Sequence, residues 1–158
     1  MKGPDDTYAV AVHGGAGPIP RDLPQGVMVA IRSGIERSLE AAREILEAGG
    51  ESIGAVVAAV EALENTAELN AGLGSVLNDD GAVEMDAAVM RGSDLSVGAV
   101  AGVGRIANPV RLAEKVRTES AHVMLIGEGA ERFAAMQRIA FVDNADLVTP
   151  ARREQWAQ

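Results

Sequence analysis

The chain is 158 residues long, carries a formal net charge of −9 and contains no cysteine. Its length and its apolar content of 47% suit one globular domain and exclude a disordered chain. The charge argues against nucleic acid as a partner, because that binding needs clustered basic side chains, and the lack of cysteine excludes disulfides, thiolate metal sites and a cysteine nucleophile.

No apolar run in the sequence is long enough to cross a membrane, so we expect no membrane partner. Residues 1–6 lack the apolar core of a signal peptide, and the cytoplasm is therefore the expected compartment. Aromatic residues make up only 3% of the chain, so small aliphatic side chains must fill the core. Such a core favours closely packed sheets and helices.

The first half of the chain predicts a strand and two helices. Residues 8–12 form an apolar run that reads as a buried strand, and residues 13–17 form the glycine turn that ends it. A one-sided apolar stripe over residues 31–46 predicts the first helix. A second stripe over residues 53–63 predicts another helix, with Ser52 as its expected N-cap.

Short strands separated by turns follow in the second half. Residues 76–90 predict a hairpin with an Asp-Gly turn, and residues 96–103 predict a third strand of the same antiparallel meander. The remaining predicted elements are a helix over 109–117 opened by Asn108-Pro109, a strand over 122–126, a helix over 130–137 and a helix over 151–156 opened by Thr149-Pro150. This order is typical of an α+β protein, and residues 1–158 show no internal linker.

The sequence by itself offers no nucleophile. No G-x-S-x-G elbow occurs, and Thr149 is better explained as a helix N-cap. His13 and His122 have no partners at a suitable spacing, so we interpret each as a hydrogen-bonded histidine in the core or at a sheet end. The glycine turn does not predict nucleotide binding, because Pro18 removes a backbone donor where a phosphate would need one.

Two further features are open to more than one interpretation. Glu84 and Asp86 alternate on a predicted strand and share a face; Glu84 is expected to be solvated, whereas Asp86 suits either acid–base chemistry or a buried acceptor role. The loop over residues 63–73 leaves a helix and has free carbonyl groups. Those carbonyls suit a hard cation, or they are ordinary helix-exit geometry.

An ordered set of motifs covers nearly the whole chain, from about residue 8 to residue 156. The motifs are HGGAG at 13–17, NAGLG at 70–74, MDAAVM at 85–90, GAVAGV at 98–103, NP at 108–109 and HVMLIGEGA at 122–130. Each motif alone is weak, but the series resembles the α-subunit of plant-type asparaginases. These are isoaspartyl peptidases of the N-terminal-nucleophile hydrolase superfamily.

The resemblance implies an αββα four-layer sandwich that is completed by a separate β-subunit, so that residues 1–158 are about half of the full domain. A precursor of this kind cuts itself before a threonine, which becomes the nucleophile on the partner chain. The implied reactions are hydrolysis of L-asparagine to L-aspartate and ammonia and cleavage of β-aspartyl dipeptides, in an (αβ)₂ assembly. Catalysis needs no cofactor, and a structural Na⁺ is expected.

The resemblance also implies roles for particular residues of this chain. Asn70 matches a supporting asparagine beside the partner-chain threonine, and Gly14 and Gly15 match a loop under the active site. The residues that bind the substrate carboxylate are expected on the partner chain. The expected Na⁺ ligands are the backbone carbonyls of Leu63, Glu64, Thr66, Leu69, Ala71 and Leu73.

Two alternatives remain at this point. A glycosylasparaginase-like amidase of the same superfamily shares the first motifs, but the lack of cysteine and of a signal peptide disfavours it. A non-catalytic binding domain would explain the missing nucleophile without any second chain. That alternative predicts a stable monomer, whereas the hydrolase interpretation predicts exposed strand edges and an exposed apolar sheet face.

Overall fold

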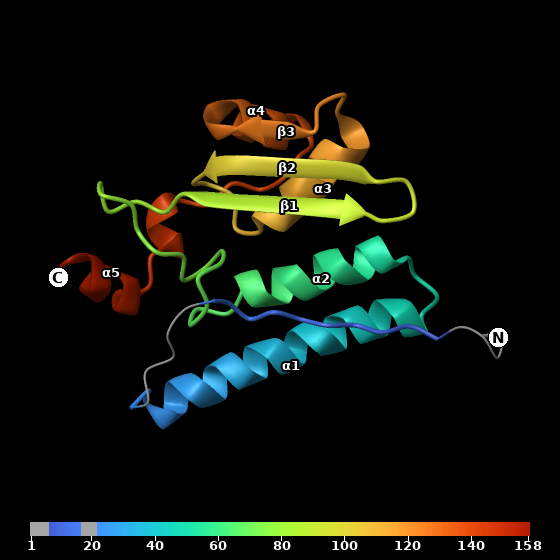
Figure 1. The fold of residues 1–158 in the computed structure, drawn as a ribbon. Helices are drawn as coiled ribbons and strands as arrows, with labels where there is room; N and C mark the ends of the chain where they lie inside the picture. Colours follow the sequence, from blue (N-terminus) through green and yellow to red (C-terminus); the bar gives the residue numbers. More distant parts are fainter. Residues whose placement is uncertain (1–6, 17–21) are drawn as a thin grey trace.

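The computed structural model describes residues 7–16 and 22–158 (Figure 1). Two long helices precede a small sheet, one helix lies between its second and third strands, and two short helices follow it along the chain. The elements are α1 (Gln25–Glu47), α2 (Ser52–Glu64), β1 (Met85–Arg91), β2 (Ser96–Val103), α3 (Pro109–Glu119), β3 (Met124–Ile126), α4 (Gly127–Met136), the 3₁₀ turn η1 (Asn144–Leu147) and α5 (Pro150–Trp156). No helix in these ranges is long and apolar enough to cross a membrane.

The sheet has three strands in the order β1-β2-β3. β1 and β2 pair antiparallel around a tight turn, as the sequence predicts, whereas Leu77 and Val83 form only an isolated bridge before β1. β3 is shorter than the strand predicted over residues 122–126, and it pairs parallel to β2. The reason is that α3 carries the chain back across the sheet, as parallel pairing requires.

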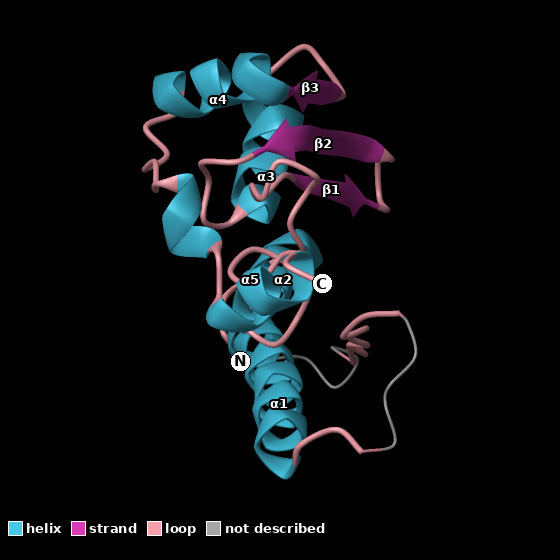
Figure 2. Ribbon diagram, turned by 90° about the vertical axis from the view of Figure 1, so that its left-hand side faces the viewer, coloured by secondary structure: helices cyan, strands magenta, loops and turns pink. Residues whose placement is uncertain are grey.

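Helices α3 and α4 cover one face of the sheet (Figure 2). The approach of α3 is close: a Cβ atom added to Gly98 would lie 2.1 Å from the carbonyl oxygen of Ala113 and 2.4 Å from the backbone nitrogen of Arg117. Val100 and Val103 of β2 are buried beneath this layer with Leu112 of α3. The main core of the described chain therefore lies between the sheet and α3.

The opposite face of the sheet is bare. In Figure 2 the strands have helices on their left side and no element of the described chain on their right. Asp86, Ala88 and Met90 of β1 are exposed on that face, and Met90 keeps 55% of its surface accessible. A large apolar side chain exposed on a free sheet face is typical of an interaction surface.

Helices α1 and α2 pack against each other as an antiparallel pair. The hydroxyl of Ser38, which is fully buried, donates a hydrogen bond to the carbonyl oxygen of Ala59 at 2.8 Å. Gly34 allows a second close contact, because an added Cβ would lie 2.6 Å from a side-chain carbon of Thr66. Through Thr66, α1 therefore touches the start of the loop that follows α2.

The prediction of a buried strand at residues 8–12 is wrong. The segment is extended, but it pairs with no other strand in the described ranges, and Tyr8 is 43% exposed. Val10 and Val12 are half-buried against α1 and α2, whereas Ala9 and Ala11 between them are exposed. A strand needs a neighbouring strand for its backbone hydrogen bonds, and the described chain places none beside this segment.

Of the three predicted helix caps, the one at Ser52 is wrong, and Asn108 occupies its predicted cap position without the side-chain hydrogen bond of a cap. Ser52 lies inside α2, whose N-cap position is Glu51. Asn108 instead donates to the side chain of Asn65 at 3.1 Å. The Thr149 cap is confirmed, since its hydroxyl accepts a hydrogen bond from the backbone of Arg152 at 3.3 Å.

Candidate functional site

The loop over residues 65–76, which follows α2, is tightly curled and is called here the α2 loop. Two glycines make the curl possible. Gly72 has φ of +56° and an added Cβ would lie 2.4 Å from the carbonyl oxygen of Glu64. Gly74 has φ of +99° and an added Cβ would lie 2.1 Å from the carbonyl oxygen of Ala67. Both the conformation and the space therefore exclude any larger residue at these two positions.

The carbonyls expected to hold Na⁺ lie at the end of α2 and in this loop. Those of Leu63, Glu64 and Thr66 each accept one backbone hydrogen bond, at 2.9, 2.8 and 3.0 Å respectively. A carbonyl oxygen has two lone pairs, so each of the three keeps one for another partner. The carbonyls of Leu69 and Ala71 have no backbone donor in the described chain. The donor set is all oxygen, which suits a hard cation.

Asn70 is an exposed residue of the α2 loop whose side chain is held in one orientation. Its amide oxygen accepts a hydrogen bond from the backbone nitrogen of Val76 at 2.9 Å. The amide nitrogen has no partner in the described chain. Asn70 therefore presents a fixed and unused hydrogen-bond donor at the surface.

A polar pocket of about 210 Å³ lies beside Asn70. Its lining includes Ser75 of the α2 loop, the buried Glu64, and Glu84 and Asp86 from the start of the sheet. Asp86 is exposed, so it is not a buried acceptor. It nevertheless accepts a hydrogen bond from the backbone nitrogen of Gly102 at 2.9 Å. Glu84 is exposed, as expected.

The Glu64 side chain is a feature that the sequence did not indicate. It is 3% exposed, and one carboxylate oxygen accepts a hydrogen bond from the backbone nitrogen of Val110 in the first turn of α3, at 3.0 Å. The other oxygen is buried without a partner. Burial raises the pKa of this carboxyl to about 7, and the hydrogen bonds from Val110 and Asn108, which lower the pKa, offset only part of that effect. The carboxyl thereby links α2 to α3 directly below the α2 loop.

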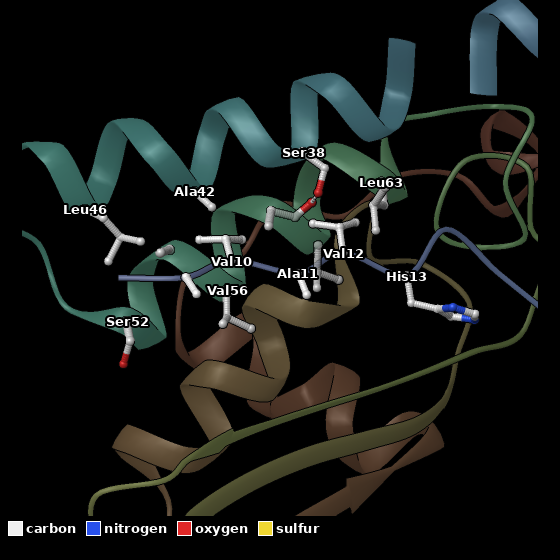
Figure 3. Close-up of a pocket in the computed structure, with 14 residues that line it drawn as sticks. Val10, Ala11, Val12, His13, Ser38, Ala42, Leu46, Ser52, Val56 and Leu63 are labelled. Carbon is white, nitrogen blue, oxygen red and sulfur yellow. Dashed lines mark hydrogen bonds between the residues drawn. The ribbon is translucent and has the colours of Figure 1, made fainter. Parts of the chain in front are cut away.

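The glycine turn at the N-terminus lies at the edge of a different hollow. An apolar groove of about 360 Å³ separates the extended segment from α1 and α2, and Val10 and Val12 point into it (Figure 3). Gly14 packs on α1, since an added Cβ would lie 2.9 Å from Ile35, and Gly15 has φ of +127°. No hydrogen bond joins Gly14 or Gly15 to Asn70 in the described chain.

The two histidines are not core residues, although His122 lies at an end of the sheet, two residues before β3. Both His13 and His122 are exposed rather than buried in a core, and His13 points away from the groove in Figure 3. Within the described ranges no serine or threonine hydroxyl is hydrogen-bonded to a histidine side chain. No cluster of acidic and histidine side chains suited to a metal ion occurs there either. The described residues thus contain no hydrogen-bonded pair of a hydroxyl nucleophile and a histidine base.

Comparison with known proteins assigns the chain to a family. The family model described as asparaginase matches residues 6–158. A protein of Macaca fascicularis named isoaspartyl peptidase/L-asparaginase is 46% identical over 147 residues, which are 92% of this chain and 46% of that protein. A plant-type L-asparaginase of Pyrococcus abyssi is 43% identical over 156 residues, which are 95% of this chain and 47% of that protein.

The chain belongs to the asparaginase family. The resemblance inferred from the ordered motifs is therefore confirmed, and the mixed helices and strands agree with it. The chain spans about half the length of the curated relatives it matches, with 46% and 47% of their lengths covered.

Proposed function

We propose that this chain is the α-subunit of a self-processing amidohydrolase that hydrolyses L-asparagine and cleaves β-aspartyl dipeptides. In this proposal a partner β-subunit supplies the N-terminal threonine nucleophile. The single observation that carries the proposal is Asn70, whose amide nitrogen is a fixed and unused donor beside a polar pocket, in a chain of the asparaginase family. Such a donor suits the stabilisation of an oxyanion or the orientation of a nucleophile.

The proposed partner has two surfaces on which to dock. One is the bare face of the sheet, where Met90 and Ile126 are 55% and 66% exposed. The other is the extended segment with its apolar groove, in which Val10 and Val12 already face the helices and the backbone has no strand partner in the described chain. Strands from the β-subunit would pair with this segment and cover this face, giving the four-layer αββα sandwich and, with a second copy, the (αβ)₂ assembly.

The proposed reaction needs no cofactor. The threonine hydroxyl of the partner attacks the side-chain amide carbon of asparagine, the threonine's own amine takes up the hydroxyl proton, and ammonia leaves. Water then hydrolyses the acyl-enzyme to aspartate. In a β-aspartyl dipeptide the leaving group is the amine of the second residue. In this proposal Asn70 acts as a donor beside the nucleophile, and Gly14 and Gly15 belong to a loop under the active site.

Intact mass spectrometry and N-terminal sequencing of the purified full-length protein test the proposal. We expect two polypeptides in equal amounts, the second beginning with threonine, and we expect the cleaved protein to release ammonia from L-asparagine and aspartate from β-aspartyl dipeptides. An uncleaved, folded protein with neither activity would contradict it. A stable monomer of this chain alone would favour the non-catalytic binding domain instead.

The α2 loop is also proposed to bind a structural Na⁺ through backbone carbonyls. Bound cation stabilises the folded state alone, so the thermal midpoint should be higher in sodium chloride than in tetramethylammonium chloride of equal ionic strength, by at least about 2 °C. The Gly72→Ala variant should lose this difference, because its Cβ would displace the carbonyl oxygen of Glu64. Gly92→Ala, at a position with no atom within 4 Å of the added carbon, should keep it. Equal midpoints of the unmodified protein in the two salts would rule out the site.

A further inference from the structure

The last residues of the sequence hold the α2 loop and the turn that follows it. The carbonyl oxygen of Leu147 accepts a hydrogen bond from the backbone nitrogen of Gly74 at 3.3 Å. The indole ring of Trp156 lies against Gly81, where an added Cβ would come within 3.1 Å of it. Residues 74–81 are therefore held at both ends by the chain around α5.

The strongest of these contacts comes from Arg152. Its Nε donates a hydrogen bond to the carbonyl oxygen of Gly74 at 2.5 Å, across 78 positions of sequence. The guanidinium has a second contact, because Nη1 donates to the side chain of Gln155 at 2.8 Å, and the Thr149 hydroxyl accepts a hydrogen bond from the backbone nitrogen of Arg152. A planar guanidinium held in this way fixes the direction of the carbonyl as well as its distance.

The position of Gly74 matters for Asn70. Gly74 lies at φ of +99° and packs closely against the carbonyl of Ala67. Two residues later, the backbone nitrogen of Val76 donates the hydrogen bond that orients the Asn70 amide. A shift of Gly74 would therefore move Val76 and turn the free amide nitrogen of Asn70 away from its present direction.

We infer that Arg152 is a positioning residue for the hydrolytic reaction, acting through Gly74 and Val76 on the side chain of Asn70. This inference rests on the proposed function, because it requires the Asn70 amide to face the reacting groups. Arg152 itself does not contact the substrate. Arg152 keeps the amide nitrogen of Asn70 in its present direction, so it affects the rate of the chemical step more than the binding of substrate.

The experiment is a double-mutant cycle in the full-length, self-cleaved protein with L-asparagine as substrate. Arg152→Ala should lower kcat about tenfold and leave KM within about twofold, because one aimed donor is lost in the transition state. In an Asn70→Ala background, Arg152→Ala should cause no further loss, since the residue through which it acts is already gone. Arg153→Ala is the matched control, because it removes the same charge from the neighbouring, exposed position of the same helix, and it should leave kcat unchanged.

The outcomes separate the inference from the function on which it rests. An unmodified protein that hydrolyses neither substrate overturns the proposed function. An active protein in which Arg152→Ala keeps full kcat, or lowers kcat equally with and without Asn70, overturns the positioning role alone. Arg152→Met retains the aliphatic stem and loses only the donors, so it decides the question in the same way should the alanine variant fail to fold.

Discussion

Replacing Gly98 by alanine should lower the free energy of unfolding by about 3 kcal/mol, because the added methyl group overlaps backbone atoms and not a mobile side chain. The Cβ would lie 2.1 Å from the carbonyl oxygen of Ala113 and 2.4 Å from the nitrogen of Arg117. Helix α3 would have to move away from β2, and it could do so only by opening the core that Val100 and Leu112 fill. Urea unfolding of the purified protein, followed by circular dichroism, measures the loss.

Gly92→Ala is the matched control for this prediction. Gly92 lies in the turn between β1 and β2, and an added Cβ would meet no atom within 4 Å. The free energy of unfolding of this variant should stay within about 0.5 kcal/mol of the unmodified value. If Gly98→Ala were as stable as Gly92→Ala, the close packing of α3 on the sheet would be wrong.

Local signals in the sequence predicted local structure well. The stripes over residues 31–46 and 53–63 became α1 and α2, and Thr149 capped α5 as expected, because helix formation and capping depend on residues a few positions apart. The apolar run at residues 8–12 failed as a strand prediction for the opposite reason. A strand depends on a distant partner, and no strand of the described chain pairs with this segment.

Of the candidate site, the sequence predicted only those residues that the resemblance to the asparaginase family names. Asn70 was found through its motif, and the structure shows that its side chain is held by Val76. The Glu64 carboxyl and Arg152 carried no signal, because their partners Val110 and Gly74 lie 46 and 78 positions away. Asn108-Pro109 correctly predicted the start of α3. The backbone nitrogen of Val110, which the Asn108 side chain was expected to cap, donates its hydrogen bond to the Glu64 carboxyl of α2 instead.

Raising the pH from 5 to 8 should lower the free energy of unfolding through Glu64 by about 2.5 kcal/mol, in buffer free of alkali cations. Burial raises the pKa of this carboxyl from its ordinary 4.5 to about 7 in the folded protein. Below pH 4.5 the folded and unfolded states both hold the proton, so ionisation of Glu64 takes nothing from the free energy of unfolding. Between pH 4.5 and pH 7 the unfolded chain releases the proton and the folded chain keeps it, so stability falls as pH rises.

The Glu64→Gln variant isolates this contribution. Its amide oxygen can still accept the hydrogen bond from Val110, but the side chain does not titrate, so the Glu64 part of the pH dependence should disappear. The variant should match the unmodified protein near pH 5 and exceed its stability at pH 8. Glu68→Gln, at an exposed position of the α2 loop, controls for the loss of one negative charge and should leave the pH dependence as it was. Equal pH dependence in the unmodified and Glu64→Gln proteins would show that the Glu64 carboxyl is ionised and solvated, and its place between α2 and α3 would have to be revised.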